Sequence, residues 1–92
     1  MPQTQPPFKL ALAALFLDGA PRTAMDAYQA LQGEYAAKAF FTPELAASTC
    51  QALTSIGIFD RCGLSDAGEI LFKLTRHGTG KVRANLGLPP QD

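Results

Sequence analysis

The amino-acid sequence predicts one mainly α-helical domain that contains a minimal β-hairpin. Its 92 residues allow a single domain with one modest core. Apolar side chains recur at intervals of three and four residues in four segments, which begin at residues suited to a helix start and end at glycines. Before the fourth segment, a short extended piece and a turn sequence interrupt this spacing. The composition, 47% hydrophobic and 17% charged, is typical of a globular domain.

The first two helices are predicted over residues 8–19 and 23–33. Pro7 suits the first turn of the first helix, and Gly19 fits the position just past its end. The apolar face of this helix is broad, so we expect it to lie centrally. In the second helix, Thr23 and Asp26 have the spacing of a capping box, and Gly33 is the expected end. Residues 34–41 remain open between a short helix and a loop.

The third helix is predicted from Thr42 to Ile56. Thr42 is the expected N-cap, Pro43 takes the first helical position, and Gly57 ends the helix. One side carries apolar residues that include Leu53 and Ile56. The opposite side carries Glu44, Ser48, Gln51 and Ser55. We therefore expect one continuous helix whose apolar side packs against its neighbours and whose mostly uncharged side faces solvent.

The hairpin and the fourth helix are expected to follow directly. Residues 60–63 have turn chemistry, which places Cys62 in the turn, and Leu64 pairs back. Ser65 is the expected N-cap of a helix that ends at Gly78, since Ala67, Ile70, Leu71 and Leu74 share one helical face. The predicted organisation is therefore a flexible lead over residues 1–7, a domain over residues 8–77 and a basic C-terminal tail over residues 78–92.

The charges are unevenly distributed although the total is zero. Residues 1–69 carry four basic and seven acidic side chains, a net charge of −3, whereas residues 70–92 carry four basic and one acidic, a net charge of +3. The C-terminal cations are the best candidates for binding an anion such as nucleic acid. The competing interpretation is that they complement a helix dipole and keep the tail soluble.

Several classes of function find no support in the sequence. Two cysteines twelve residues apart and one histidine do not make a zinc site, and no cofactor is expected. The GTGK segment lacks the first glycine of a phosphate-binding loop, because Thr75 stands there, and Val82 follows its lysine. His77 has no partner that would make a catalytic constellation, so no enzyme is expected. The apolar run over residues 10–17 is too short to span a membrane, and we expect a cytoplasmic protein.

The order of helices, hairpin and LSDAG segment resembles the winged-helix fold, most nearly the PadR- and MarR-like bacterial regulators. In those families the third helix enters the major groove, a hairpin wing follows, and a Leu-Thr-x-x-Gly segment leads into the next helix. Leu64, Ser65 and Gly68 match that segment with serine in place of threonine. Two departures are the short predicted hairpin, with Arg61 as its one cation, and the lack of any lysine or arginine between Thr42 and Gly57.

Two functions remain open. The first is a small nucleic-acid-binding regulator, similar to a helix-turn-helix transcription factor, that binds double-stranded DNA as a homodimer. Its predicted contacts are base edges through the third helix and phosphates through cations, and the residues are Ser48, Gln51, Ser55, Arg61, Lys73, Arg76, Lys81 and Arg83. The second is a non-enzymatic protein-interaction module, either a subunit of a larger complex or an inhibitor of the kind found in phages and mobile elements.

Overall fold

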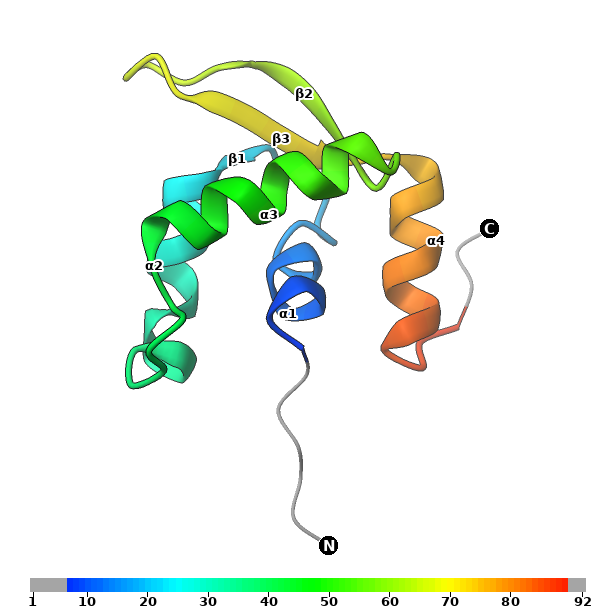
Figure 1. Cartoon of the computed structure of the whole chain (residues 1–92). Helices are drawn as coiled ribbons and strands as arrows, with labels where there is room; N and C mark the ends of the chain where they lie inside the picture. Colours follow the sequence, from blue (N-terminus) through cyan, green and yellow to red (C-terminus); the bar gives the residue numbers. More distant parts are fainter. Residues whose placement is uncertain (1–6, 90–92) are drawn as a thin grey trace, which may run out of the picture.

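A computed structural model of the chain describes residues 7–89. The predicted lead lies outside the described residues except for Pro7, as do residues 90–92 of the predicted tail. The elements follow in the order α1 (Phe8–Ala14), β1 (Arg22–Thr23), α2 (Ala24–Tyr35), α3 (Pro43–Ser55), β2 (Phe59–Leu64), β3 (Ile70–Leu74) and α4 (Arg76–Asn85). The strands form one antiparallel sheet in the order β1-β3-β2. α1, α2 and α4 extend away from the sheet in the same general direction, and α3 runs across them beneath the hairpin (Figure 1).

The core joins α1 to the sheet through aromatic rings. Phe16 follows α1 and is fully buried, with its ring centroid 4.5 Å from that of Phe59 at the start of β2. The Phe59 ring lies 6.1 Å from that of Phe72 in the neighbouring strand β3. Leu12 is also fully buried. The expected central position of the first helix is therefore confirmed, although regular α-helix ends at Ala14 and turns continue to Asp18.

The capping box predicted for α2 is present, but the predicted end of this helix is wrong. The Thr23 hydroxyl accepts a hydrogen bond from the Asp26 amide, and the Asp26 carboxylate accepts one from the Thr23 amide, both at 3.0 Å. The helix continues past Gly33 to the buried Tyr35. The Tyr35 ring packs edge-on against Phe8 of α1 at a centroid distance of 5.6 Å, so tertiary packing extends the helix by two residues. Residues 36–41 form turns and loop.

The limits and the sidedness predicted for the third helix are confirmed. The Thr42 hydroxyl accepts a hydrogen bond from the Leu45 amide at 3.1 Å, Pro43 occupies the first turn, and Gly57 follows the helix with φ +80°. The buried side consists of Ala46, Thr49, Cys50 and Leu53. Ile56, the C-cap, was expected to pack on this side; it borders the same groove as Leu53 but is 60% exposed.

The helix predicted from Ser65 to Gly78 is wrong. A turn ends the strand β2 instead, and the segment from Ile70 to Leu74 is the strand β3. The Ser65 hydroxyl accepts a hydrogen bond from the Glu69 amide at 3.1 Å across a turn in which Gly68 has φ +81°, so Ser65 caps a turn and not a helix. Strand periodicity places Phe72 inward, next to Phe59, and this burial favours the extended form. The hairpin is therefore longer than the minimal one predicted.

Cys62 lies in β2 and not in the predicted turn. Arg61 pairs with Phe72, and Gly63 pairs with Leu71, so Cys62 is the extra residue of a β-bulge. Gly63 has φ +131°, a conformation that residues with a side chain seldom adopt. The turn chemistry of residues 60–63 thus produces an irregularity inside a strand.

The short strand β1 was not predicted. It pairs Arg22 with Phe72 and Thr23 with Leu71, which makes β3 the central strand. The Arg22 guanidinium binds both carboxylate oxygens of Asp18 at 2.7 and 2.8 Å, and this pairing holds the pKa of the Asp18 carboxyl well below its usual range. This ion pair closes the loop between α1 and the sheet.

The junction between the hairpin and α4 depends on Thr75 and Gly78. The Thr75 hydroxyl donates a hydrogen bond to the Gly57 carbonyl at 2.6 Å and accepts one from the Gly78 amide at 2.8 Å. The Thr75 amide donates to the Ile58 carbonyl at 2.9 Å. Gly78 therefore lies in the first turn of α4 and does not end a helix, and the expected boundary at residue 78 falls inside α4. A Cβ atom at Gly78 would overlap the Ile58 backbone.

Replacing Gly78 with alanine should destabilise the domain. The substitution Gly78→Ala should lower the free energy of unfolding by about 2 kcal/mol, because the overlap with backbone at Ile58 outweighs the better helix propensity of alanine. Gly80→Ala is the matched control in the same helix, since a Cβ atom at Gly80 would have nothing within 4 Å. It should raise the free energy of unfolding by roughly 0.5–1 kcal/mol. Urea denaturation measures both values, and equal effects at the two sites would contradict the close approach.

The two cysteines should differ strongly in reactivity. Cys62 is exposed, whereas Cys50 is fully buried on the inner side of α3, and burial raises the pKa of its thiol to about 12. A chromogenic disulfide reagent at pH 8 should therefore modify one thiol per chain quickly and the second only on unfolding. Cys62→Ser should remove the fast reaction, and adding Ser48→Cys on the solvent side of α3 should restore it. Two fast-reacting thiols in the unmodified chain would contradict the burial of Cys50 on the inner side of α3.

Candidate nucleic-acid interface

The outer face of α3 presents the hydrogen-bonding residues expected from the sequence. Ser48, Gln51 and Ser55 are all exposed on this face. The hydroxyls of Ser48 and Ser55 donate to carbonyls of their own helix, at Leu45 and Gln51, each at 3.1 Å. The Gln51 amide makes no hydrogen bond within residues 7–89, so its donor and its acceptor can both meet a ligand.

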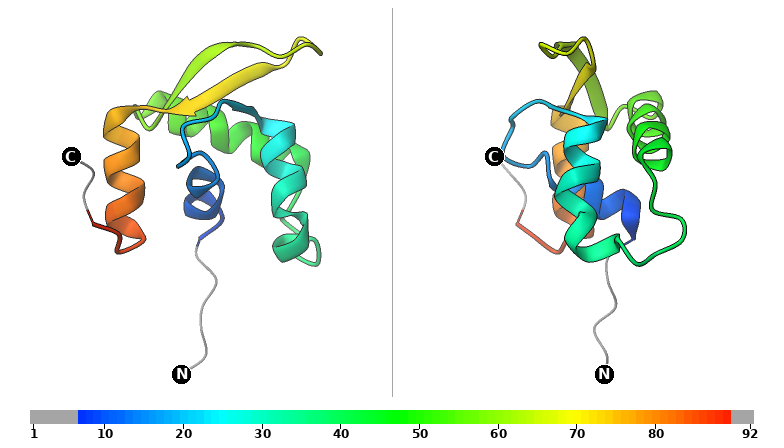
Figure 2. Two further views of the ribbon diagram at one scale, coloured as in Figure 1. Left: turned by 180° about the vertical axis from the view of Figure 1, so that it is seen from behind. Right: turned by 90° about the vertical axis from the view of Figure 1, so that its left-hand side faces the viewer.

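A hollow lies between the hairpin and α3 beside Gln51. The hollow has a volume of about 310 Å³, and its walls come from the start of α2, from α3 and from the far end of the hairpin. Gln51 and Ala47 contribute from α3, Met25 from α2, and Glu69 and Ile70 from the hairpin. Figure 2 shows the hairpin projecting beyond the helices in both views. Glu69 therefore borders the same hollow as Gln51, a neighbour that sequence spacing did not indicate.

The charges on α3 and the hairpin sum to a negative value. α3 carries Glu44 as its one charged residue, and β2, its turn and β3 carry three acidic and two basic side chains. The acidic residues of the hairpin are Asp60, Asp66 and Glu69, and all three are exposed. This surface can form hydrogen bonds through α3, but it attracts phosphates only at particular points.

Two predicted phosphate contacts lie on opposite faces of the hairpin. Arg61 pairs across the strands with Phe72, which faces the core, so Arg61 lies on the face that looks toward the helices, although it is exposed. Lys73 pairs with Asp60 on the outer face. The carboxylate of Asp60 therefore stands opposite Lys73, whereas Arg61 has an aromatic ring as its cross-strand neighbour.

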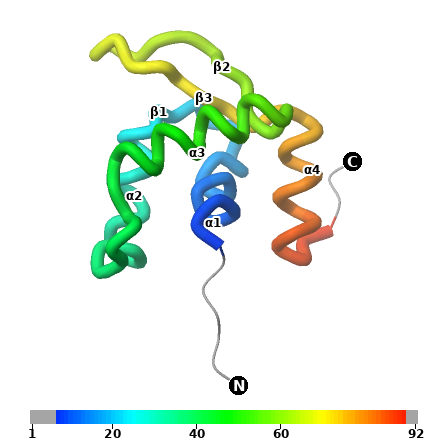
Figure 3. Tube along the Cα trace, in the orientation of Figure 1, coloured from blue at the N-terminus to red at the C-terminus, as the bar shows by residue number. Residues whose placement is uncertain are grey.

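The remaining predicted cations belong to α4, which runs away from the hairpin (Figure 3). Arg76 follows Thr75 and lies near the end of α3, where Thr75 bonds to Gly57. Lys81 borders a groove between α4, α1 and the end of α3. The Arg83 guanidinium donates to the Pro89 carbonyl at 2.8 Å. The structure thus brings together Ser48, Gln51, Ser55 and the hairpin, with Arg76 at the edge, but it does not bring Lys81 and Arg83 to that face.

The Leu-Thr-x-x-Gly signal was assigned to the wrong residues. The pattern occurs without substitution at Leu74, Thr75 and Gly78, where Thr75 caps α4 and Gly78 lies against Ile58. The match expected at Leu64, Ser65 and Gly68 lies ten residues earlier. For this reason the start of the fourth helix was predicted at Ser65, ten residues before the observed N-cap Thr75. The later match would have predicted the longer hairpin.

Neither a metal site nor a membrane-spanning helix is found within residues 7–89. That part of the chain contains no group of three histidine, cysteine or acidic side chains placed to hold a metal ion. None of the helices in that range has both the length and the apolar character needed to cross a bilayer.

Comparison with known proteins supports the fold. No family model and no curated protein matches the sequence. The structure resembles that of RosR from H. salinarum, with a TM-score of 0.71 and 15% sequence identity, over 92% of this chain and 74% of that one. The domain consists of four helices and a small three-stranded antiparallel sheet, so it is not purely α-helical, and this architecture is compatible with a winged-helix-like domain.

Proposed function

We propose that this chain is a DNA-binding regulator that contacts double-stranded DNA through the outer face of α3 and the hairpin. The observation that carries the proposal is the exposed face of α3, which bears one charge, at Glu44, and offers Ser48, Gln51 and Ser55 beside a projecting hairpin. The similarity in fold to RosR supports the scaffold on which this proposed role rests. The finer assignment to PadR- or MarR-like regulators is part of this proposal and rests on the sequence resemblance alone.

The geometry of α3 suits direct reading of bases. The major groove of B-DNA is about 12 Å wide and admits an α-helix. The Gln51 amide can donate to and accept from adenine, and the serine hydroxyls can meet base edges or phosphates. Arg61, on the hairpin face that looks toward the helices, and Arg76, at the start of α4, would hold phosphates on either side of the helix.

We further propose that the chain binds DNA as a homodimer. Two cations per copy neutralise few phosphates, and specific binding at physiological salt needs more contacts than one such module supplies. A two-fold assembly doubles the number of phosphate contacts. It would place two α3 helices in successive major grooves, about 34–36 Å apart.

Two substitutions should separate base reading from phosphate binding. With a duplex selected from a random pool, Gln51→Ala should weaken binding by about 1–3 kcal/mol and relax the preference at one base pair. Arg61→Gln should weaken binding to every duplex and lower the slope of log affinity against log salt by about 0.9 for each copy bound. Fluorescence anisotropy at two or more salt concentrations measures both effects.

Lys38→Gln is the control that removes one exposed positive charge without touching this surface. Lys38 lies in the connection between α2 and α3. This connection leaves α2 at the end that points away from the sheet (Figure 1). Replacement of Lys38 should leave affinity and salt slope almost unchanged. Failure to bind any duplex at about 50 mM salt, or equal effects of Arg61→Gln and Lys38→Gln, would refute the proposal.

A protein-interaction module is the second candidate, and the negative balance of α3 and the hairpin favours it. Asp60, Asp66 and Glu69 form an acidic hairpin that would suit a basic protein surface better than a phosphate backbone. Apolar side chains that are exposed nearby, Leu64 at 66% and Ile70 at 39%, would add contact area to such an interface.

The sign of one charge change distinguishes the two candidates. The double variant Asp66→Asn, Glu69→Gln removes two negative charges from the hairpin. Affinity for DNA should rise about threefold to tenfold if the hairpin lies near phosphates, because repulsion is removed. For a basic protein partner the association rate should instead fall, most strongly at low salt. Anisotropy with DNA, and biosensor kinetics with any basic partner isolated with the chain, measure the two responses.

A further inference from the structure

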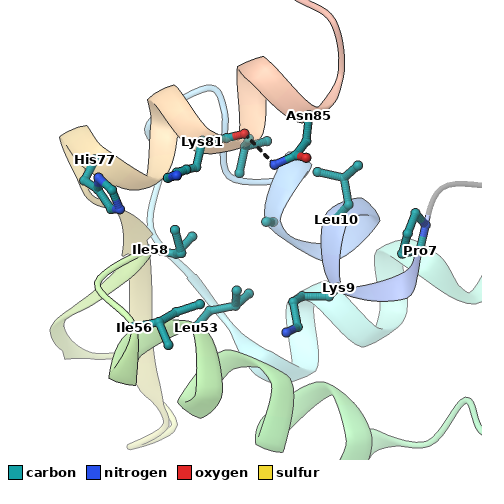
Figure 4. A pocket seen from close by; sticks show the side chains of 11 residues that line it. Pro7, Lys9, Leu10, Leu53, Ile56, Ile58, His77, Lys81 and Asn85 are labelled. Carbon is teal, nitrogen blue, oxygen red and sulfur yellow. Dashed lines mark hydrogen bonds between the residues drawn. The ribbon is translucent and has the colours of Figure 1, made fainter.

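A groove on the other side of α3 is separate from the proposed DNA interface. It has a volume of about 500 Å³ and lies between α1, the end of α3 and α4. Leu10, Leu53, Ile56 and Ile58 give it apolar walls (Figure 4). Its size falls within the usual range of small-molecule sites, about 300–1,000 Å³.

The polar side chains of this groove are basic or neutral. Lys9 from α1 and Lys81 from α4 extend into the open space from opposite walls, and His77 lies at its edge (Figure 4). No aspartate or glutamate is among the described residues that line it. The Asn85 side-chain amide donates to the Lys81 carbonyl at 2.9 Å, which holds this side chain against α4. Positive charge over apolar walls is therefore the chemical character of this groove.

We propose that the groove binds an amphipathic organic anion, a carboxylate with an apolar body of about eight to twelve carbon atoms. The apolar walls would cover the body, since removing apolar surface from water is favourable. The Lys9 and Lys81 ammonium groups, which move on flexible stems, would meet the carboxylate from two sides. An inorganic anion would gain the charge contacts but leave the walls uncovered, and an apolar cation would be repelled.

Decanoate is a suitable probe of this site in the intact chain. Titration followed by two-dimensional ¹H–¹⁵N NMR should give saturable shifts at α1, the end of α3 and the first turns of α4, with Kd on the order of 0.1–1 mM. The double variant Lys9→Gln, Lys81→Gln should weaken binding about fivefold, a value reduced for the solvent exposure of both lysines. Ile56→Asn should weaken it by a similar factor through the apolar wall.

Arg76→Gln is the matched control, because Arg76 is an exposed cation of the same helix but does not line the groove. It should leave the affinity for decanoate unchanged, and decyltrimethylammonium should bind far more weakly to the unmodified chain. Equal binding of the two amphiphiles, or no effect of the lysine substitutions in variants with unchanged free spectra, would overturn the proposal. So would a dimer, seen by sedimentation, that Ile56→Asn dissociates and that excludes decanoate, since a second copy would then fill the groove. Binding of decanoate by a chain that binds no DNA would refute only the function proposed above.

Discussion

The hydrogen bonds of Thr75 to the backbone at Gly57 and Ile58 determine how the other elements lie. Together with the bond from the Gly78 amide to the Thr75 hydroxyl, they join the end of α3, the base of the hairpin and the start of α4. Threonine serves here because one hydroxyl donates to a carbonyl and accepts from an amide at the same time. Gly78 is needed because the first turn of α4 touches the Ile58 backbone. This junction holds the hairpin over α3 and directs α4 away from it.

The elements that local chemistry defines were predicted best. Thr23 and Thr42 accept bonds from amides three residues later, and such caps depend on nearby sequence alone. The prediction of the fourth helix was wrong because the apolar residues from Ala67 to Leu74 have helical spacing, but the segment from Ile70 to Leu74 forms the strand β3. Non-local contacts decide between the two forms: Phe72 packs on Phe59, and β1 and β2 pair with β3 on both sides. Sequence spacing holds no information on those partners.

The part of the candidate interface that lies on α3 could be predicted from the sequence, and the part that lies on the hairpin could not. The outward position of Gln51 follows from its spacing along a correctly predicted helix. The position of Glu69 beside the same hollow does not, since it depends on the length of the hairpin and on its turn at Gly68. The opposite faces of Arg61 and Lys73 depend on pairing register, and the bulge at Cys62 alters that register one residue later. Counting cations along the chain therefore overestimates the positive charge that one surface can present.

The groove and the junction at Thr75 share Ile58. Leu53 and Ile56 face the groove, and Ile58, whose carbonyl accepts the bond from the Thr75 amide, lines it as well. The same carbonyl lies against Gly78, so the Ile58 backbone has no room to move toward α4. An occupant of the groove would thus contact side chains on a backbone that is already held. We therefore expect an occupant to affect the hairpin mainly by displacing α4 about Thr75, where α4 joins the hairpin.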